Sequence, residues 1–147
     1  MKIVQLKRGQ IEDVIALETE CFAHPWTYEN IEAQYNSPNS HFFVAVDDDG
    51  KAIGYIGTYM VMDECFVTNV AVTESQRKQG VGYALVEKAV DTAKSSGASF
   101  ITLEVRFSNM PAINLYKKFD FISEGVRPGF YRDPDEDALI MTRRFSL

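Results

Sequence analysis

The sequence predicts one mixed α/β domain, in which helices flank a central, mostly antiparallel sheet. Its 147 residues match the size of an ordinary single domain, and no linker or repeat divides them, so we take residues 1–147 as one domain. Apolar residues recur at helical spacing in some segments and form short continuous runs in others. Three such runs follow one another between residues 42 and 72 with only short polar turns between them, which is typical of an antiparallel meander.

The chain begins with a short strand and two helices. Apolar residues at positions 3–6 predict the strand, and helical spacing over residues 11–22 predicts an amphipathic helix. Pro25 ends that helix or its extension. Thr27 is a suitable N-cap for a second helix over residues 28–35.

Three strands make up the middle of the chain. Residues 42–46 meet an acidic turn at 47–50, and residues 52–61 follow as the hairpin partner. Asp63 and Glu64 make a second reversal before a strand at 65–72. The three strands are therefore expected to pair in chain order.

Helices and strands alternate in the second half. One apolar helical face starts after Gly80 and extends to residue 93, and Gly97 occupies the place of a C-terminal cap. A buried strand at 99–105 follows, and Asn109 can cap the next helix, which continues to residue 119. Two last strands are predicted at 121–131 and 138–145, joined by the polar turn 133–137.

Composition and charge exclude several classes of protein. Hydrophobic residues make up 46% and charged residues 24%, which argues against disorder. A net charge of -6 repels phosphate backbones, so we expect no direct nucleic-acid partner. The longest uncharged apolar stretch, 52–62, is too short to span a membrane, and the first residues lack the pattern of a signal peptide. We therefore expect a cytoplasmic protein with no membrane partner.

The strongest local signal is the segment Arg77-Lys78-Gln79-Gly80-Val81-Gly82-Tyr83, between a strand and a helix. Its glycines let backbone amides approach a ligand, and the helix N-terminus together with Arg77 and Lys78 favours an anion such as a pyrophosphate. The residues of a phosphate-binding P-loop and the third glycine of a dinucleotide-binding fingerprint are absent. A tight, solvated turn is the alternative interpretation.

The segment Arg-x-x-Gly-x-Gly over residues 77–82, preceded by Val70-Ala71-Val72, resembles the acyl-CoA-binding motif of the GNAT acetyltransferase superfamily. Asn109-x-x-Ala112-x-x-x-Tyr116 followed by Phe119-x-Phe121 is similar to its second cofactor motif. Over essentially the whole chain, the sequence resembles the ribosomal-protein-alanine N-acetyltransferases. The segments that carry this likeness are residues 22–27, 103–106, 108–109 and 138–141.

The resemblance implies a GNAT-type fold whose central strands splay apart at the cofactor site. It also implies transfer of an acetyl group from acetyl-CoA to the N-terminal alanine of a small-subunit ribosomal protein, by direct attack in a ternary complex and without a metal. Glu104 matches the general base and Tyr116 the general acid. The other roles that it implies are acetyl and pantetheine contacts by the backbone of Val70, Ala71 and Val72, pyrophosphate binding by Arg77, Lys78, Gln79, Gly80, Val81, Gly82 and Tyr83, a pantetheine hydrogen bond from Asn109, and a peptide groove lined by Trp26 and Tyr131.

The two catalytic assignments are chemically reasonable. An N-terminal amino group has a pKa of about 7.7–8.0 and must lose a proton before it attacks. Glu104 is the only acid within residues 99–105 and can take that proton, directly or through one water. A phenol such as that of Tyr116 can protonate the departing thiolate.

Each assignment has a structural alternative. Tyr116, Trp26 and Tyr131 could be packed core residues, and Glu104 could be a strand-end charge paired with Arg106 or a lysine. Cys21 with His24 or His41 could form a cysteine nucleophile, but a buried cysteine is more often a small apolar residue. Cys21 and Cys65 have no metal-type spacing.

Two other functions remain open: a GNAT enzyme for a small-molecule amine, and a non-catalytic acyl-CoA-binding module. The acidic turns at 47–49 and 133–137 bear on the choice of substrate. An acidic rim near the groove mildly favours a basic polypeptide, whereas solvated turns that aid solubility are the alternative.

Overall fold

A seven-stranded sheet organises the computed structural model, which describes residues 1–145. Its strand order is β1-β2-β3-β4-β5-β7-β6, and every neighbouring pair is antiparallel except β4 and β5. The strands are β1 (Lys2–Gln5), β2 (Ser40–Val46), β3 (Ala52–Val61), β4 (Glu64–Val72), β5 (Phe100–Arg106), β6 (Ile122–Tyr131) and β7 (Glu136–Arg144). The mixed α/β fold expected from the sequence is confirmed.

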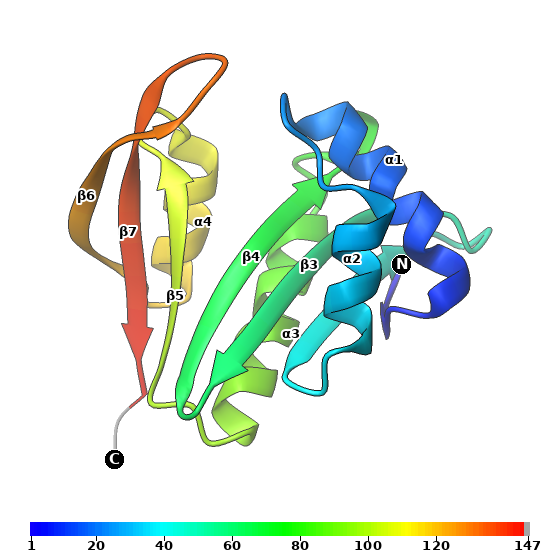
Figure 1. The fold of residues 1–147 in the computed structure, drawn as a ribbon, viewed down its shortest axis with the longest axis horizontal. Coiled ribbons are helices and arrows are strands. Elements are labelled where there is room, and N and C mark those ends of the chain that lie inside the picture. Colours follow the sequence, from blue (N-terminus) through cyan, green and yellow to red (C-terminus); the bar gives the residue numbers. More distant parts are fainter. Residues whose placement is uncertain (146–147) are drawn as a thin grey trace.

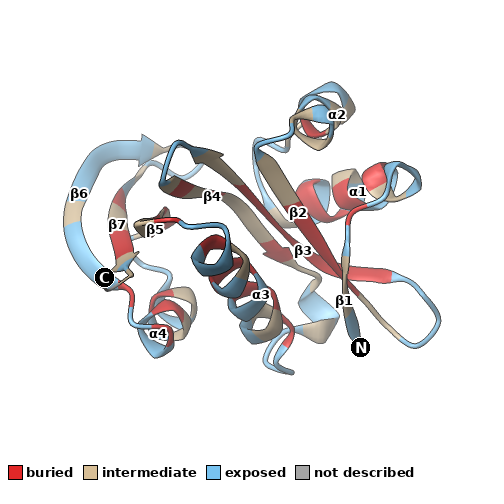
Figure 2. Cartoon of the chain, turned by 90° about the horizontal axis from the view of Figure 1, so that it is seen from below, coloured by how far each residue is buried: buried red, intermediate tan, exposed pale blue. Residues whose placement is uncertain are grey.

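Helices cover both faces of this sheet (Figures 1 and 2). Successive residues of β2 point to opposite faces, so Phe42 and Val44 pack with α1 and α2 while Phe43 and Ala45 pack with α3. The buried residues therefore form two clusters, one on each face of the sheet. The helices are α1 (Ile11–Cys21), α2 (Tyr28–Asn36), α3 (Val81–Ser95) and α4 (Met110–Lys118), with two 3-10 turns, η1 (Arg8–Gln10) and η2 (Glu74–Gln76).

The predicted capping residues lie where the sequence places them. Thr27 Oγ1 accepts a hydrogen bond from the Asn30 amide at the start of α2, and Asn109 Oδ1 accepts one from the Ala112 amide at the start of α4. The last hairpin differs from expectation. Tyr131 pairs with Glu136, so β7 begins two residues earlier than predicted and the turn is shorter. Polar composition alone does not distinguish a turn from a paired strand end.

The central strands β4 and β5 diverge along their length (Figure 1). They pair in parallel only at Glu64–Phe100, Cys65–Ile101 and Phe66–Thr102. Beyond Phe66 the edge of β4 that faces β5 is therefore unpaired, and its peptide groups are open to a ligand. This is the splay that the family resemblance implies.

A bulge in β4 lies beside the splay. Gly57 of β3 pairs with Asn69 and Thr58 pairs with Val67, which leaves Thr68 as an extra residue. Thr68 Oγ1 donates to the Gly57 carbonyl at 3.0 Å. A side chain at position 57 would lie 2.6 Å from the Phe42 ring, so only glycine fits opposite the bulge.

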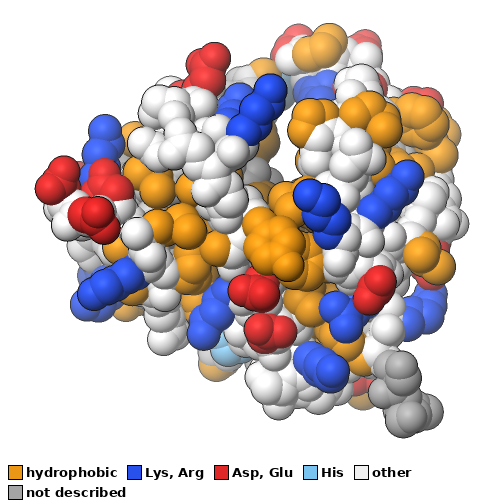
Figure 3. All heavy atoms as spheres, turned by 180° about the vertical axis from the view of Figure 1, so that it is seen from behind, with side chains coloured by type: hydrophobic (Ala, Val, Ile, Leu, Met, Phe, Trp, Pro, Cys, Tyr) orange, Lys and Arg blue, Asp and Glu red, His pale blue; other side chains and the backbone are white. Residues whose placement is uncertain are grey.

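No helix within residues 1–145 is both long enough and apolar enough to cross a bilayer. On the face seen in Figure 3, acidic, basic and apolar side chains are intermingled. The acidic residues therefore do not form a single patch on this face.

Candidate functional site

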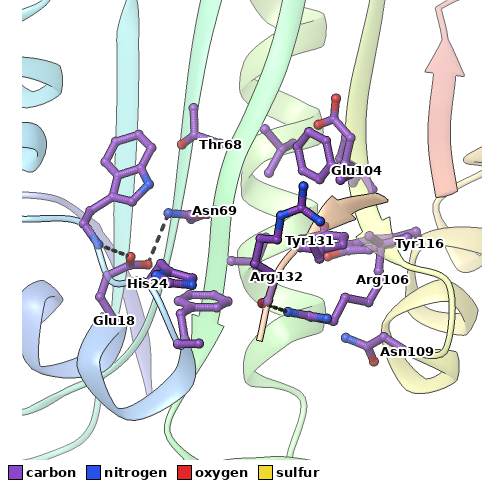
Figure 4. A pocket seen from close by; sticks show the side chains of 18 residues that line it. Glu18, His24, Thr68, Asn69, Glu104, Arg106, Asn109, Tyr116, Tyr131 and Arg132 are labelled. Atoms are coloured by element: carbon purple, nitrogen blue, oxygen red, sulfur yellow. Dashed lines mark hydrogen bonds between the residues drawn. The ribbon is translucent and has the colours of Figure 1, made fainter. Parts of the chain in front are cut away.

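A groove of about 520 Å³ opens where β4 and β5 separate (Figure 4). Residues 67–70 of β4 and 103–106 of β5 form its sides. Glu18 and residues from the α1–α2 loop line one end, and Asn109, Tyr116 and residues 130–132 line the other. The groove thus collects side chains from both halves of the chain.

Glu104 lies on β5 between two buried residues, Leu103 and Val105, and points to the opposite face of the strand. Its side chain is 30% exposed, and Oε1 accepts a hydrogen bond from Nε of Arg127 at 3.1 Å. Arg127 is therefore its partner, and not Arg106, which the sequence offers as an alternative. Among the described residues, Oε2 receives no hydrogen bond and remains available to accept a proton.

Tyr116 is both a core residue and a groove residue. Its ring is buried and packs 5.8 Å from that of Phe121, yet the side chain lines the groove. Burial, with a smaller contribution from Tyr131, raises the pKa of the Tyr116 phenol above its ordinary value. The phenol is therefore protonated at neutral pH and can act as a proton donor.

Tyr131 is held by Arg106, a residue that the sequence offered only within a family motif and as an alternative partner of Glu104. The Arg106 guanidinium lies 4.5 Å from the centre of the Tyr131 ring. It also donates to the carbonyls of Arg132 and Pro134 at 3.0 and 2.8 Å, and to Glu136 at 3.3 Å. Burial, with Glu104 next in importance, raises the pKa of Tyr131 to about 12. One arginine thus fixes the whole β6–β7 turn beside the groove.

The acidic residues of the β6–β7 turn are engaged within the protein. Asp133 Oδ2 lies 2.6 Å from Nε2 of His24, which joins the turn to the α1–α2 loop. The other contacts are Asp135 with Arg132, Glu136 with the Ser108 amide and Arg106, and Asp137 with the Gly129 amide. Arg132 and Arg106 therefore offset part of the negative charge of this turn, while the carboxylates bonded to backbone amides keep theirs.

Glu18 is a groove residue that the sequence analysis missed. Its side chain is completely buried, and Oε1 accepts the Trp26 amide at 2.8 Å. Oε2 accepts the Tyr55 hydroxyl at 2.5 Å and Nδ2 of Asn69 at 3.2 Å. A signal was present: Glu18 follows Ile11 and Val14 at helical spacing and so falls on the buried stripe of α1.

The expected pyrophosphate segment forms a tight loop before α3. Lys78 and Gly80 both have positive φ, 65° and 85°, and the first amides of α3 have no partner within the helix. A side chain at position 82 would contact Leu115 at 3.3 Å, so Gly82 lets α3 approach α4. The Arg77 side chain points to the end of β4, where its Nε donates a hydrogen bond to the Val72 carbonyl at 3.0 Å.

Asn109 and Val70 lie at the groove, and Ala71 and Val72 follow Val70 along the open edge of β4. Because Oδ1 of Asn109 accepts the Ala112 amide, its Nδ2 is left as a donor toward the groove. The side chains of Val70 and Val72 pack on one face of the sheet and that of Ala71 on the other. The peptide groups of this segment lie along the unpaired edge of β4, and their contact with a cofactor stays a prediction.

The alternative cysteine nucleophile is not assembled. The Cys21 thiol lies 3.5 Å from the Val72 carbonyl, which it contacts as a donor, while His24 is paired with Asp133 and His41 stacks on Phe43. Over residues 1–145, no group of three or more His, Cys, Asp or Glu side chains is arranged to hold a metal ion.

Comparison with known proteins identifies the family. Residues 11–121 match the Acetyltransferase (GNAT) family. The chain belongs to the GNAT family.

Relatives of this GNAT protein match it over nearly their full length. A protein named [Ribosomal protein bS18]-alanine N-acetyltransferase from Escherichia coli K12 is 32% identical, over 99% of this chain and 98% of the relative. A Bacillus subtilis relative with the same name, given provisionally, is 39% identical over 92% of this chain and 90% of its own. The crystal structure of the ribosomal-protein-S18-alanine N-acetyltransferase from Escherichia coli superposes with a TM-score of 0.90 at 30% identity, covering 99% of this chain and 94% of that one.

The GNAT groove brings together six of the residues singled out in the sequence: Trp26, Val70, Glu104, Asn109, Tyr116 and Tyr131. Ala71, Val72 and residues 77–83 do not line it. Glu18, Asn69 and Arg106 line the groove but were not predicted as site residues, and Arg127 reaches it through Glu104.

Proposed function

We propose that this GNAT protein transfers the acetyl group of acetyl-CoA to the α-amino group at a protein N-terminus. One observation carries the proposal: a carboxylate and a buried phenol, Glu104 and Tyr116, line the same groove at the splay of β4 and β5. A non-catalytic acyl-CoA-binding module would need neither group.

The relatives' names favour a particular substrate. We infer that it is the N-terminal alanine of a small-subunit ribosomal protein, because the relatives named for that activity match this chain from end to end. We place the reaction in the cytoplasm, where such a substrate is made. The groove between the α1–α2 loop and the β6–β7 turn has walls at Trp26 and Tyr131 that suit an extended chain end.

The residues present fit acetyl-CoA as the second substrate. The open edge of β4 at residues 70–72 offers peptide groups to the acetyl and pantetheine portion. Nδ2 of Asn109 offers a donor to the same arm. The first amides of α3, with the exposed Lys78, offer an anion site for the pyrophosphate, and Arg77 supports the loop from β4.

The chemistry proceeds by direct attack. Glu104 takes a proton from the substrate ammonium, directly or through one water, and releases it to solvent. The amine nitrogen then attacks the thioester carbonyl, and the new C–N bond replaces the C–S bond. Backbone N–H groups of residues 70–72 stabilise the developing oxyanion. Tyr116 protonates the departing sulfur and regains a proton from the nitrogen as the amide forms.

A thiol-release assay tests this function. The substrates are acetyl-CoA with peptides that differ only in a first residue of Ala, Ser or Met, each with a copy blocked at its N-terminus, and free amines such as polyamines. We expect turnover of the Ala peptide and none of its blocked copy. Turnover confined to the free amines would overturn the proposal.

A further inference from the structure

Glu18 is a buried charge without a cationic partner. Its side chain has no exposure, and within residues 1–145 no Lys, Arg or His forms an ion pair with it. An isolated buried carboxylate is costly unless hydrogen bonds compensate it. The hydrogen bonds of Glu18 in the wall of the groove must therefore compensate the cost of its burial.

Three donors from three different elements converge on this carboxylate. The Trp26 amide belongs to the α1–α2 loop, the Asn69 amide group to β4, and the Tyr55 hydroxyl to β3. Figure 4 shows the contacts to the loop and to Asn69 at one end of the groove. Glu18 itself comes from α1, so a single side chain joins four segments.

Two of these donors belong to the groove and one belongs to the core. Trp26 is one of the lining residues of the loop, and Asn69 follows the bulged residue Thr68 on β4. Tyr55 is completely buried and lies beneath them. The carboxylate therefore fixes the distance between the loop and the bulged strand, which are two walls of the groove.

We propose that Glu18 is a positioning residue for the peptide substrate: its carboxylate holds the Trp26 loop against the bulge of β4 and so sets the shape of the peptide groove. The identity of the ligand rests on the proposed function, whereas the positioning of the loop does not. The residues proposed to bind acetyl-CoA, 70–72 of β4 and the loop before α3, form no hydrogen bond with Glu18, so we expect acetyl-CoA binding to be largely unaffected by its substitution.

Acceptor chemistry decides which substitutions preserve this role. A backbone N–H must meet an acceptor, so Gln at position 18 would turn its oxygen toward Trp26 and its NH₂ toward Asn69. Asn69 can answer by rotating its amide, and the Tyr55 hydroxyl can accept instead of donate. Met has a similar length and accepts only weakly, so it would release the loop.

The sole tryptophan of the chain allows a test without substrate, because Trp26 is the loop's own fluorophore. We expect Glu18→Met to increase acrylamide quenching of Trp26, and Glu18→Gln to stay close to wild type. Tyr55→Phe is the matched control, since it removes the core donor and leaves both groove contacts. Equal quenching in Glu18→Met and Tyr55→Phe would overturn the proposal.

Steady-state kinetics test the consequence for the peptide. We expect Glu18→Met to raise the KM for an Ala-starting peptide about tenfold or more, the scale of one lost charge-assisted hydrogen bond. The kcat and the Kd for acetyl-CoA should remain within about threefold of wild type, and Glu18→Gln should recover most of the KM. Parallel losses in kcat and acetyl-CoA affinity would show a general structural role and contradict the proposal.

The wild-type protein provides a measurement that does not depend on the folding of any variant. The Trp26 amide should exchange its hydrogen at least about 100-fold more slowly than an unstructured amide, because it is bonded to a buried carboxylate. Fast exchange would refute the positioning role. If the wild type acetylated no peptide, the proposed function would fail, while quenching and exchange would still decide whether Glu18 holds the loop.

Discussion

Arg127 on β6 reaches across β7 to donate a hydrogen bond from Nε to Oε1 of Glu104 on β5, at 3.1 Å. Ile140 of β7 pairs with Glu104 on one side and with Gly125 on the other. Arg127 is two residues beyond Gly125, so its side chain lies on the same face of the sheet as Glu104 and can reach it. The pair orients the proposed base and leaves its second oxygen without a hydrogen bond among the described residues. A sheet order in which β7 lies between β5 and β6 is thus part of the proposed catalytic arrangement.

Glu104→Gln should lower kcat by about 100-fold or more, the usual contribution of general base catalysis, because an amide cannot accept the ammonium proton. The Kd for acetyl-CoA should stay close to wild type. Glu124→Gln is the matched control, since Glu124 forms a similar strand-to-strand pair with Arg144 at 2.9 Å away from the groove. A kcat for Glu104→Gln equal to that of the control would remove Glu104 from the base role.

Arg127→Met should lower kcat by about three- to tenfold, less than Glu104→Gln, because it frees the carboxylate without removing it. Arg127→Lys should restore part of the rate, since an ammonium group can still pair with Oε1. Arg144→Met serves as the control on the Glu124 pair. We would abandon the orienting role of Arg127 if its Met variant turned over peptide at the wild-type rate.

Tyr116→Phe should lower kcat by about 100-fold, within the range of general acid catalysis, and leave acetyl-CoA binding nearly unchanged. The ring still fills its place against Phe121, so the loss concerns the proton and not the packing. Tyr59→Phe, on β3 outside the groove lining, is the control. An equal effect of both substitutions would exclude Tyr116 as the acid.

Arg106→Met should raise the KM for peptide, by about fivefold or more, since it removes the hydrogen bonds that hold the β6–β7 turn and the contact with the Tyr131 ring. Arg143→Met is the comparison, because Arg143 also donates to a backbone carbonyl, that of Phe119, but does not line the groove. An unchanged KM would mean that the turn holds its shape without Arg106.

Stability should fall as the pH rises above about 9, and Cys65 should carry part of the fall. Burial raises the pKa of the Cys65 thiol from 9.0 to about 11. The neutral thiol is favoured in the folded state, so between pH 9 and pH 11 the unfolded chain binds fewer protons than the folded one. The free energy of unfolding therefore decreases with pH in this window. Chemical denaturation at pH 8 and pH 11 should show a smaller decrease in Cys65→Ala, and an identical decrease would contradict the assignment.

The sequence predicted the order of helices and strands because apolar periodicity reports which face of each element is buried. Glu104 and Tyr116 were selected through a resemblance to family motifs, and the structure brings both to one groove. Arg127 could not be found in this way, since its contact depends on which strand lies between β5 and β6. Glu18 could have been found, because a charged residue on the buried stripe of α1 needs partners. The internal pairing of Asp133 and its neighbours depends on the folded turn, so it could not be predicted from the acidic sequence.

Transfer to a protein N-terminus is tested most directly by locating the acetyl group on a peptide that begins with Ala and contains an internal Lys. After incubation with the wild-type protein and acetyl-CoA, fragmentation by mass spectrometry assigns the modified nitrogen. We expect one acetyl group on the α-amine of Ala and an unmodified Lys, with the product greatly reduced for Glu104→Gln. Acetylation on the Lys side chain, or on the α-amine at the same rate with Glu104→Gln, would contradict it.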